Sequence, residues 1–80
     1  MSHIGALIKK KRIEKGLTQF QLAVKLGSFS PMFISSIENG KALLPLRYLV
    51  ALCTVLGIKK EEAVNAVIFD YSKRVKGEIG

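Results

Sequence analysis

The sequence predicts an all-α fold, a compact single domain of five helices. Apolar residues recur at three- and four-residue spacing in five segments, which is typical of helices with one buried side. Glycine and proline stand between these segments, where they end or begin helices. A chain of 80 residues is close to the lower limit for independent folding, which excludes a multidomain enzyme.

The first helix is expected over residues 4–15, with Gly16 as its C-terminal cap. Its basic run at residues 9–12 is either a solvated surface or faces phosphate. The second helix is expected to begin at Thr18, whose hydroxyl can accept a bond from a free backbone amide, and to end at Gly27. The core sides of these two helices should carry Ile4, Leu7, Ile8, the further candidate Ile13, Leu22, Ala23 and Leu26.

The third helix is expected to begin with Ser30 as its cap and Pro31 at its first position, where a missing amide hydrogen costs nothing. It should end near residues 39–40. Ile34 and Ile37 are three residues apart and should face the core. The opposite side of this helix is therefore uncharged and made mostly of small side chains.

The fourth helix is expected to start after Pro45 and to be terminated by Gly57, and the fifth is expected over about residues 60–75. The fifth has acidic residues in its first turn and basic residues at its end, as the helix dipole favours. Its apolar residues cover more of the circumference than one core-facing side requires, so part of that surface should contact a partner. The fourth should bury Leu46, Leu49, Val50, Leu52, Cys53 and Leu56.

The net charge of +7 favours a polyanionic partner, either nucleic acid or an anionic membrane surface. Acidic residues interrupt the polar side of the fifth helix and there is no tryptophan, which argues against the membrane. The longest apolar stretch, residues 48–58, is far shorter than the roughly 20 residues of a membrane helix. With one cysteine, no zinc-ligand spacing and no signal-peptide layout, we expect a soluble cytoplasmic protein without metal or cofactor.

Residues 17–27 and 34–41 together resemble the helix-turn-helix family of phage lambda-type repressors. The most specific matches are the Leu-Thr-Gln opening of the second helix, the Leu-Ala pair inside it, and the Ile-Glu-Asn-Gly-Lys end of the third. The resemblance covers about residues 4–64 and implies a double-stranded DNA-binding regulator whose third helix enters the major groove. Two short helices joined by a glycine-containing turn, in basic surroundings, agree with this interpretation.

The resemblance implies a phosphate contact for Gln19 and base recognition by the first turn and outer side of the third helix. The candidate DNA-binding residues are Gln19, Ser30, Pro31, Met32, Phe33, Ser35, Ser36, Asn39 and Lys41. The first turn lacks Arg, Gln and Asn, so bidentate base contacts are absent there, and Pro31 and Met32 favour thymine methyl groups. Alternatively, Gln19 is a solvated helix former, Met32 is a surface residue, and Phe33 packs on the second helix.

Two departures from the family pattern affect the loops. The segment between Gly27 and Ile34 is one residue longer than the commonest family spacing, and Phe29 is expected to fill the core from this turn. The loop after the third helix has few basic residues, and its Leu43 and Leu44 are expected to pack on the core or join an interface. The resemblance also implies an internal ion pair between Arg12 and Glu38.

Proteins of this type place two recognition helices about 34 Å apart, so a homodimer is expected. The fifth helix, about residues 60–76, is the candidate seam, with Ile68, Phe69 and Tyr71; alternatively these residues cap the monomer core. An antitoxin that binds a partner protein and represses its own operon is the competing interpretation. Catalysis is not expected, because His3 lies at a terminus that should fray and Cys53 lies on an apolar helix without a base nearby in sequence.

Overall fold

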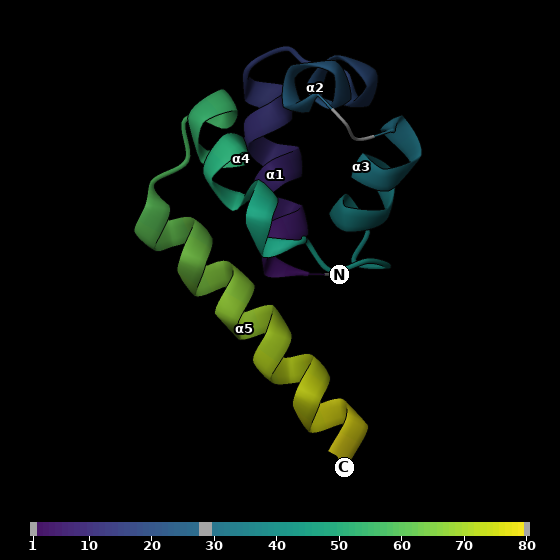
Figure 1. The fold of residues 1–80 in the computed structure, drawn as a ribbon, viewed down its shortest axis with the longest axis vertical. Coiled ribbons are helices and arrows are strands. Elements are labelled where there is room, and N and C mark those ends of the chain that lie inside the picture. The colour runs from purple at the N-terminus through teal and green to yellow at the C-terminus, as the bar shows by residue number, and fades with distance from the viewer. Residues whose placement is uncertain (1, 28–29, 80) are drawn as a thin grey trace.

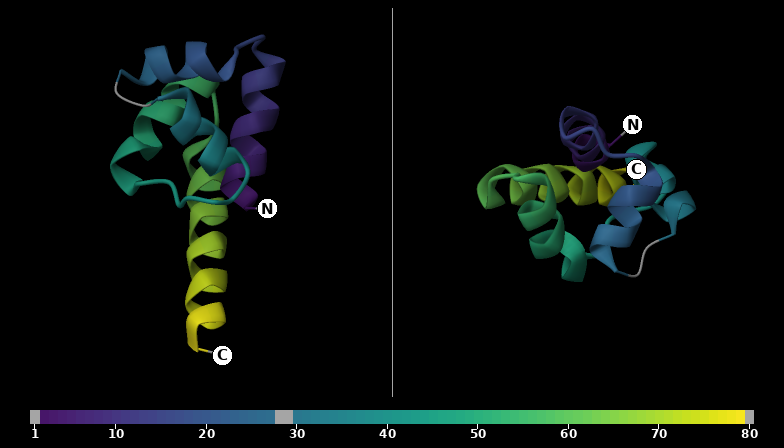
Figure 2. Two further views of the ribbon diagram at one scale, coloured as in Figure 1. Left: turned by 90° about the vertical axis from the view of Figure 1, so that its right-hand side faces the viewer. Right: turned by 90° about the horizontal axis from the view of Figure 1, so that it is seen from above.

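The computed structural model describes residues 2–27 and 30–79, which contain helices and no strand, as predicted (Figure 1). The elements are α1 (His3–Glu14), α2 (Gln19–Leu26), α3 (Pro31–Glu38), a 3₁₀ turn (Leu46–Tyr48), α4 (Leu49–Leu56) and α5 (Lys60–Ile79). The first four α-helices form a compact body. The long α5 begins beside α4, crosses α1 and projects beyond the body (Figures 1 and 2).

Local side-chain caps define where α2 and α3 begin. The Thr18 hydroxyl accepts from the Gln21 backbone N–H at 3.0 Å, and the Gln21 side chain accepts from the Thr18 N–H at 2.8 Å. Ser30 likewise accepts from the Phe33 N–H at 3.2 Å, with Pro31 at the first helical position. Gly27 ends α2 with φ of +83°, a conformation that glycine adopts without strain.

The core lies where α1, α2, α3, α4 and the first half of α5 meet. Cys53 is buried in it, as expected, and Leu44 joins it from the loop after α3 while Leu43 is half-buried. The buried apolar residues are Ile4, Ile8, Leu22, Ala23, Ile34, Ile37, Leu44, Leu52, Cys53, Leu56, Ile58, Ala63 and Val67. One residue of α1 must be glycine, because a Cβ at Gly5 would collide with the carbonyl oxygens of Ile37 and Glu38.

Three core predictions were wrong. Ile13 is 58% exposed because Arg12, one position earlier, occupies the inward side of α1. Leu46 and Val50 are 59% and 62% exposed, since the inward side of α4 is the i, i+3, i+4, i+7 set that begins at Leu49. Leu46 itself lies in the 3₁₀ turn that precedes α4.

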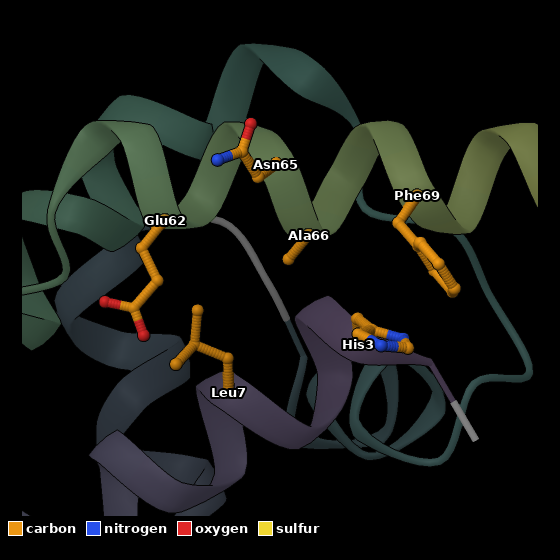
Figure 3. A pocket seen from close by; sticks show the side chains of 6 residues that line it. All are labelled: His3, Leu7, Glu62, Asn65, Ala66 and Phe69. Atoms are coloured by element: carbon orange, nitrogen blue, oxygen red, sulfur yellow. The ribbon is translucent and has the colours of Figure 1, made fainter.

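The N-terminus of α1 is fastened to α5, so the expectation that His3 lies at a frayed end was also wrong. The backbone N–H groups of His3 and Ile4 donate to the two carboxylate oxygens of Asp70 at 2.8 and 2.9 Å. The His3 ring lies 4.1 Å from the Phe69 ring between centroids (Figure 3). Further along α5, the Tyr71 hydroxyl donates to the Leu44 carbonyl at 3.2 Å.

Candidate nucleic-acid interface

The outward side of α3 is uncharged and accessible, while its inward side is buried. Ile34 and Ile37 are buried, whereas Pro31 is exposed and Met32 is 78% exposed. Ser35 and Ser36 are half-buried along the same helix. The remaining expectations for the preceding turn, including core filling by Phe29, lie outside the described residues.

Several candidate DNA-binding side chains already make internal contacts. The Ser30 hydroxyl caps α3, and Asn39 donates to the Ser35 hydroxyl at 3.3 Å. Phe33 is half-buried against the core, which agrees with its packing interpretation. Lys41 is exposed in the loop beyond α3. The structure therefore exposes Pro31, Met32 and Lys41, while Ser30, Ser35 and Asn39 make hydrogen bonds within α3 or at its ends.

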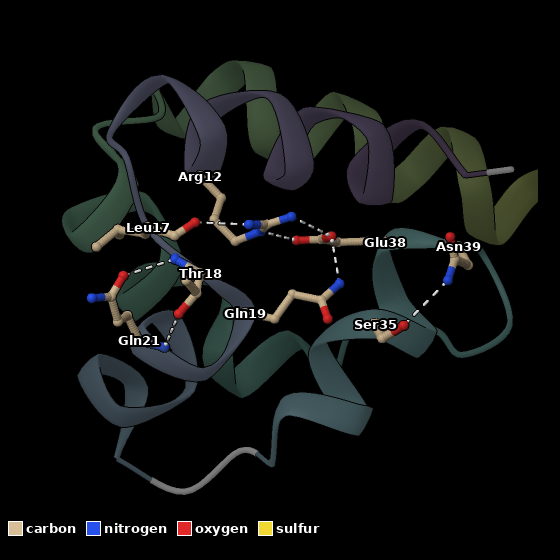
Figure 4. Close-up of polar contacts among 8 residues, drawn as sticks. All are labelled: Arg12, Leu17, Thr18, Gln19, Gln21, Ser35, Glu38 and Asn39. Carbon is tan, nitrogen blue, oxygen red and sulfur yellow. Dashed lines mark hydrogen bonds and ion pairs between the residues drawn. The ribbon is translucent and has the colours of Figure 1, made fainter.

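A buried polar network joins α1, α2 and α3 behind this surface (Figure 4). The Arg12 guanidinium makes two bonds to the Glu38 carboxylate, from Nε to Oε2 at 2.7 Å and from Nη2 to Oε1 at 3.2 Å. A third bond from Nη1 reaches the Leu17 carbonyl at 2.7 Å. Gln19 Nε2 also donates to Glu38 Oε1, at 3.1 Å. Gln19 is therefore more than a solvated helix former.

The basic run at residues 9–12 is divided by the fold. Lys9 and Lys10 are exposed, Lys11 lies 3.8 Å from the Glu14 carboxylate, and Arg12 is buried. Only the first two lysines are therefore both exposed and outside these ion pairs. Lys25 on α2 is exposed as well.

The three candidate dimer residues differ in exposure. Ile68 and Phe69 are 58% and 41% exposed. The Phe69 ring also contacts the His3 ring, and the Lys73 ammonium lies 5.2 Å from the centroid of the Phe69 ring. Tyr71 is half-buried and bonded to Leu44, which agrees with the capping interpretation for that residue. An apolar groove of about 470 Å³ is lined by Leu46, Leu49, Val64, Val67, Ile68, Tyr71 and Ser72.

Residues 2–27 and 30–79 contain no group of three His, Cys, Asp or Glu side chains placed to hold a metal ion. A pocket of about 450 Å³ between α1 and α5 is lined by His3, Leu7, Glu62, Asn65, Ala66 and Phe69 (Figure 3). Burial raises the pKa of the Cys53 thiol, and the nearby charge of Lys60 opposes that shift only partly.

Of the helices within residues 2–27 and 30–79, none is long and apolar enough to cross a bilayer.

Sequence reasoning missed two contacts of this region. Asp70 carries no local motif, and its partners at the start of α1 are more than 60 residues away in sequence. The bond between Gln19 and Glu38 joins two residues that the sequence assigned to different roles. The signal available in the sequence is that Asp70 follows Ala63 and Val67 at i+7 and i+3, which places it on the side of α5 that those two residues bury.

Comparisons with known proteins identify a family and two relatives. A family model described as helix-turn-helix matches residues 8–62. A 56-residue stretch, 70% of this chain and 36% of the relative, is 43% identical to the "Putative multi-protein-binding factor 1" of Yarrowia lipolytica (strain CLIB 122 / E 150). A 40-residue stretch, 50% of this chain and 43% of the relative, is 52% identical to the "ImmF control region 10 kDa protein" of Bacillus phage phi105. No solved structure gives a significant match. The matched segments span less than half of either relative.

Proposed function

Because the chain belongs to the lambda-repressor-like helix-turn-helix family, we propose that it is a sequence-specific regulator of transcription that binds double-stranded DNA. The family consists of DNA-binding regulators rather than enzymes. In this proposal the protein acts as a dimeric repressor and inserts α3 into the major groove of a palindromic operator. The observation that carries it is the outward side of α3, where Met32 is 78% exposed and every side chain is uncharged.

The chemistry of that side suits a particular kind of sequence. Pro31 and Met32 offer apolar contacts to thymine methyl groups, and Ser36 offers a hydroxyl that either donates or accepts. Lys41, Lys9 and Lys10 are exposed cations for phosphate, and the net charge of +7 adds attraction over longer distances. A·T-rich half-sites are the expected target.

Dimer formation would place two copies of α3 on one side of the DNA. Ile68 and Phe69 remain exposed on α5, and the groove beside them is almost entirely apolar. A two-fold contact uses the same patch on both chains, which these residues allow. The 52% identity to a phage control-region protein supports a role at a regulatory DNA site.

Selection of bound sites from random duplex DNA at physiological salt tests this function. Enrichment of an inverted repeat with half-sites about one helical turn apart is the expected result. Met32→Ala should reduce enrichment, whereas Val50→Ala, which shortens another exposed apolar side chain, on α4 and 62% exposed, should not. Absence of an enriched motif, with binding that disappears as salt rises, would reject sequence-specific recognition.

A protein-binding function, such as that of an antitoxin that regulates its own operon, is the second candidate. The apolar groove of about 470 Å³ on the α4–α5 side favours it, and the name of the yeast relative refers to binding of several proteins. Sedimentation of the purified chain separates the two interpretations. If the wild-type protein is a dimer and Ile68→Ser makes it a monomer, the result supports the self-associating regulator. If the wild-type protein is a monomer that binds DNA poorly, the result supports the protein-binding function.

A further inference from the structure

Glu38 is a single carboxylate that touches side chains from two other helices. It is the last residue of α3 and is 3% exposed, so protein groups surround almost all of it. Arg12 from α1 donates to both of its oxygens, and Gln19 from α2 donates to one of them (Figure 4). No buried side-chain nitrogen or oxygen among the described residues lacks a partner.

This bond fixes the orientation of the Gln19 amide. An ionised carboxylate can only accept hydrogen bonds, so the end of the amide that faces Glu38 must be the nitrogen. Nε2 carries two hydrogens, and one of them is used by Glu38 Oε1 at 3.1 Å. The second hydrogen remains available to a group outside the network. Gln19 is the first residue of α2, where the helix dipole and free backbone N–H groups favour a phosphate.

Arg12 makes this arrangement compatible with a nearby phosphate. A carboxylate beside an anion-binding side chain would repel the anion if its charge were not balanced. The guanidinium balances it, with Nε 2.7 Å from Oε2, and Oε1 accepts from both Arg12 Nη2 and Gln19 Nε2. The network therefore supplies an oriented donor without adding local negative charge.

We propose that Glu38 is a positioning residue for DNA binding: it holds the Gln19 amide so that its second N–H donates to a phosphate oxygen. The proposal rests on the proposed function and deepens it. Glu38 itself does not touch DNA. Its effect on DNA affinity therefore passes through Gln19, and removal of Gln19 should abolish that effect.

A double-mutant cycle in DNA affinity tests this dependence. The probe is the duplex with the highest enrichment in the selection experiment, or a random-sequence duplex at low salt if none is enriched. In Glu38→Gln, Arg12 retains the amide oxygen and the new NH₂ group faces Gln19, which must rotate away. Because a bond to a charged group is involved, Gln19→Ala and Glu38→Gln should each weaken binding about tenfold, and together still about tenfold.

A second probe identifies the phosphate. A duplex with a neutral methylphosphonate at the contacted position should bind the wild-type protein about tenfold more weakly, yet leave Gln19→Ala and Glu38→Gln unaffected. A purely structural role of Glu38 would not produce this selective insensitivity. Asp70→Asn is the matched control, since it also alters a buried carboxylate, but one bonded to the start of α1 and not to α2.

Each outcome decides the proposal. Non-additive losses with methylphosphonate insensitivity support it. Additive losses, or an unchanged affinity of Glu38→Gln, overturn it and leave the proposed function intact. A wild-type protein that binds neither duplex overturns both. If Glu38→Gln does not fold, Glu38→Asp keeps the charge beside Arg12 but withdraws the carboxylate from Gln19, and the same tenfold loss is expected.

Discussion

Glu38 and Asp70 are both buried carboxylates, at 3% and 8% exposed, but different groups compensate their charges. Glu38 is paired with the positively charged guanidinium of Arg12, which lies on α1. Asp70 accepts from two backbone N–H groups at the start of α1, where the helix dipole is positive. The His3 ring Nδ1 also lies 3.7 Å from Asp70 Oδ1. The comparison teaches that the N–H groups of a helix end can hold a buried acidic side chain without an Arg or Lys partner.

The two carboxylates also differ in what they hold in place. Glu38 joins the helices of the candidate DNA interface. Asp70 completes the N-terminal cap of α1: Ser2 accepts from the Gly5 N–H at 2.8 Å, and Asp70 accepts from the two preceding amides, those of His3 and Ile4. Loss of Glu38 contacts should therefore disturb α1–α3 packing, and loss of Asp70 should release α5 from α1.

The largest effect is expected from Arg12→Met. This change leaves the Glu38 carboxylate buried without its cation, which should lower the free energy of unfolding by about 3–5 kcal/mol. Urea denaturation followed by circular dichroism measures it. A loss below about 1 kcal/mol would show that the pair behaves like an exposed one.

A compensating variant keeps this prediction sharp even if Arg12→Met does not fold. Arg12→Met combined with Glu38→Leu replaces the pair by apolar side chains of similar size and should regain most of the lost stability. Continued instability of the double variant would indicate that the bonds to Leu17 and Gln19 matter more than the charge.

Asp70→Ala should have the next largest effect, a loss of about 2 kcal/mol, because two amides of α1 lose a charged acceptor. Hydrogen exchange at the Ile4 amide should become much faster than exchange at buried core amides such as that of Ile34. Asp70→Asn should lose less, since its remaining oxygen can still accept one of the two bonds. Equal protection of Ile4 in all three proteins would contradict the capping role.

Gln19→Ala should change stability by under about 1 kcal/mol, because Arg12 still satisfies the Glu38 carboxylate after the amide is gone. Thermal unfolding measures this small difference. Together with a tenfold loss of DNA affinity, it would separate the binding role of Gln19 from any role in folding. A stability loss as large as that of Arg12→Met would contradict this prediction, because the loss of DNA affinity could then follow from impaired folding.

Cys53 should give the smallest effect and is a buried titratable group of another kind. Burial raises the pKa of its thiol from the ordinary value of 9.0, so the folded protein holds this proton more tightly than the unfolded chain. The stability that the thiol contributes is therefore complete below that value and is lost as pH rises through its folded-state pKa. Urea unfolding of wild type and Cys53→Ala from about pH 8 to about pH 10.5 should show this loss only in the wild type.

The helix ends of α2 and α3 could be predicted because their causes are local. Thr18, Ser30 and Pro31 act within three residues of their own positions, and Gly27 ends its helix by its own backbone conformation. The end of α5 was harder to locate. Its helix continues past the expected residue 75 to Ile79, since a lone glycine in a helical pattern does not have to end it.

The candidate site was predicted only as a set of positions. The family pattern indicated Gln19 and the pair of Arg12 with Glu38, but the bond that joins them depends on how α2 and α3 pack. The Asp70 contacts depend on the meeting of two segments that are distant in sequence, and no periodic pattern records such a meeting. Arg12 illustrates the same limit, because its charge concealed that it replaces an apolar residue on the inward side of α1.

The hydrogen bond from Tyr71 to the Leu44 carbonyl gives the molecule a built-in optical probe. The chain has no tryptophan and two tyrosines, so its near-ultraviolet absorption and emission come mainly from phenol rings. Tyr71 is half-buried and bonded where α5 meets the loop after α3, and its spectrum depends on both conditions. Release of α5 from the body should therefore change the tyrosine spectrum without any attached dye, and Tyr48→Phe would leave Tyr71 as the sole reporter.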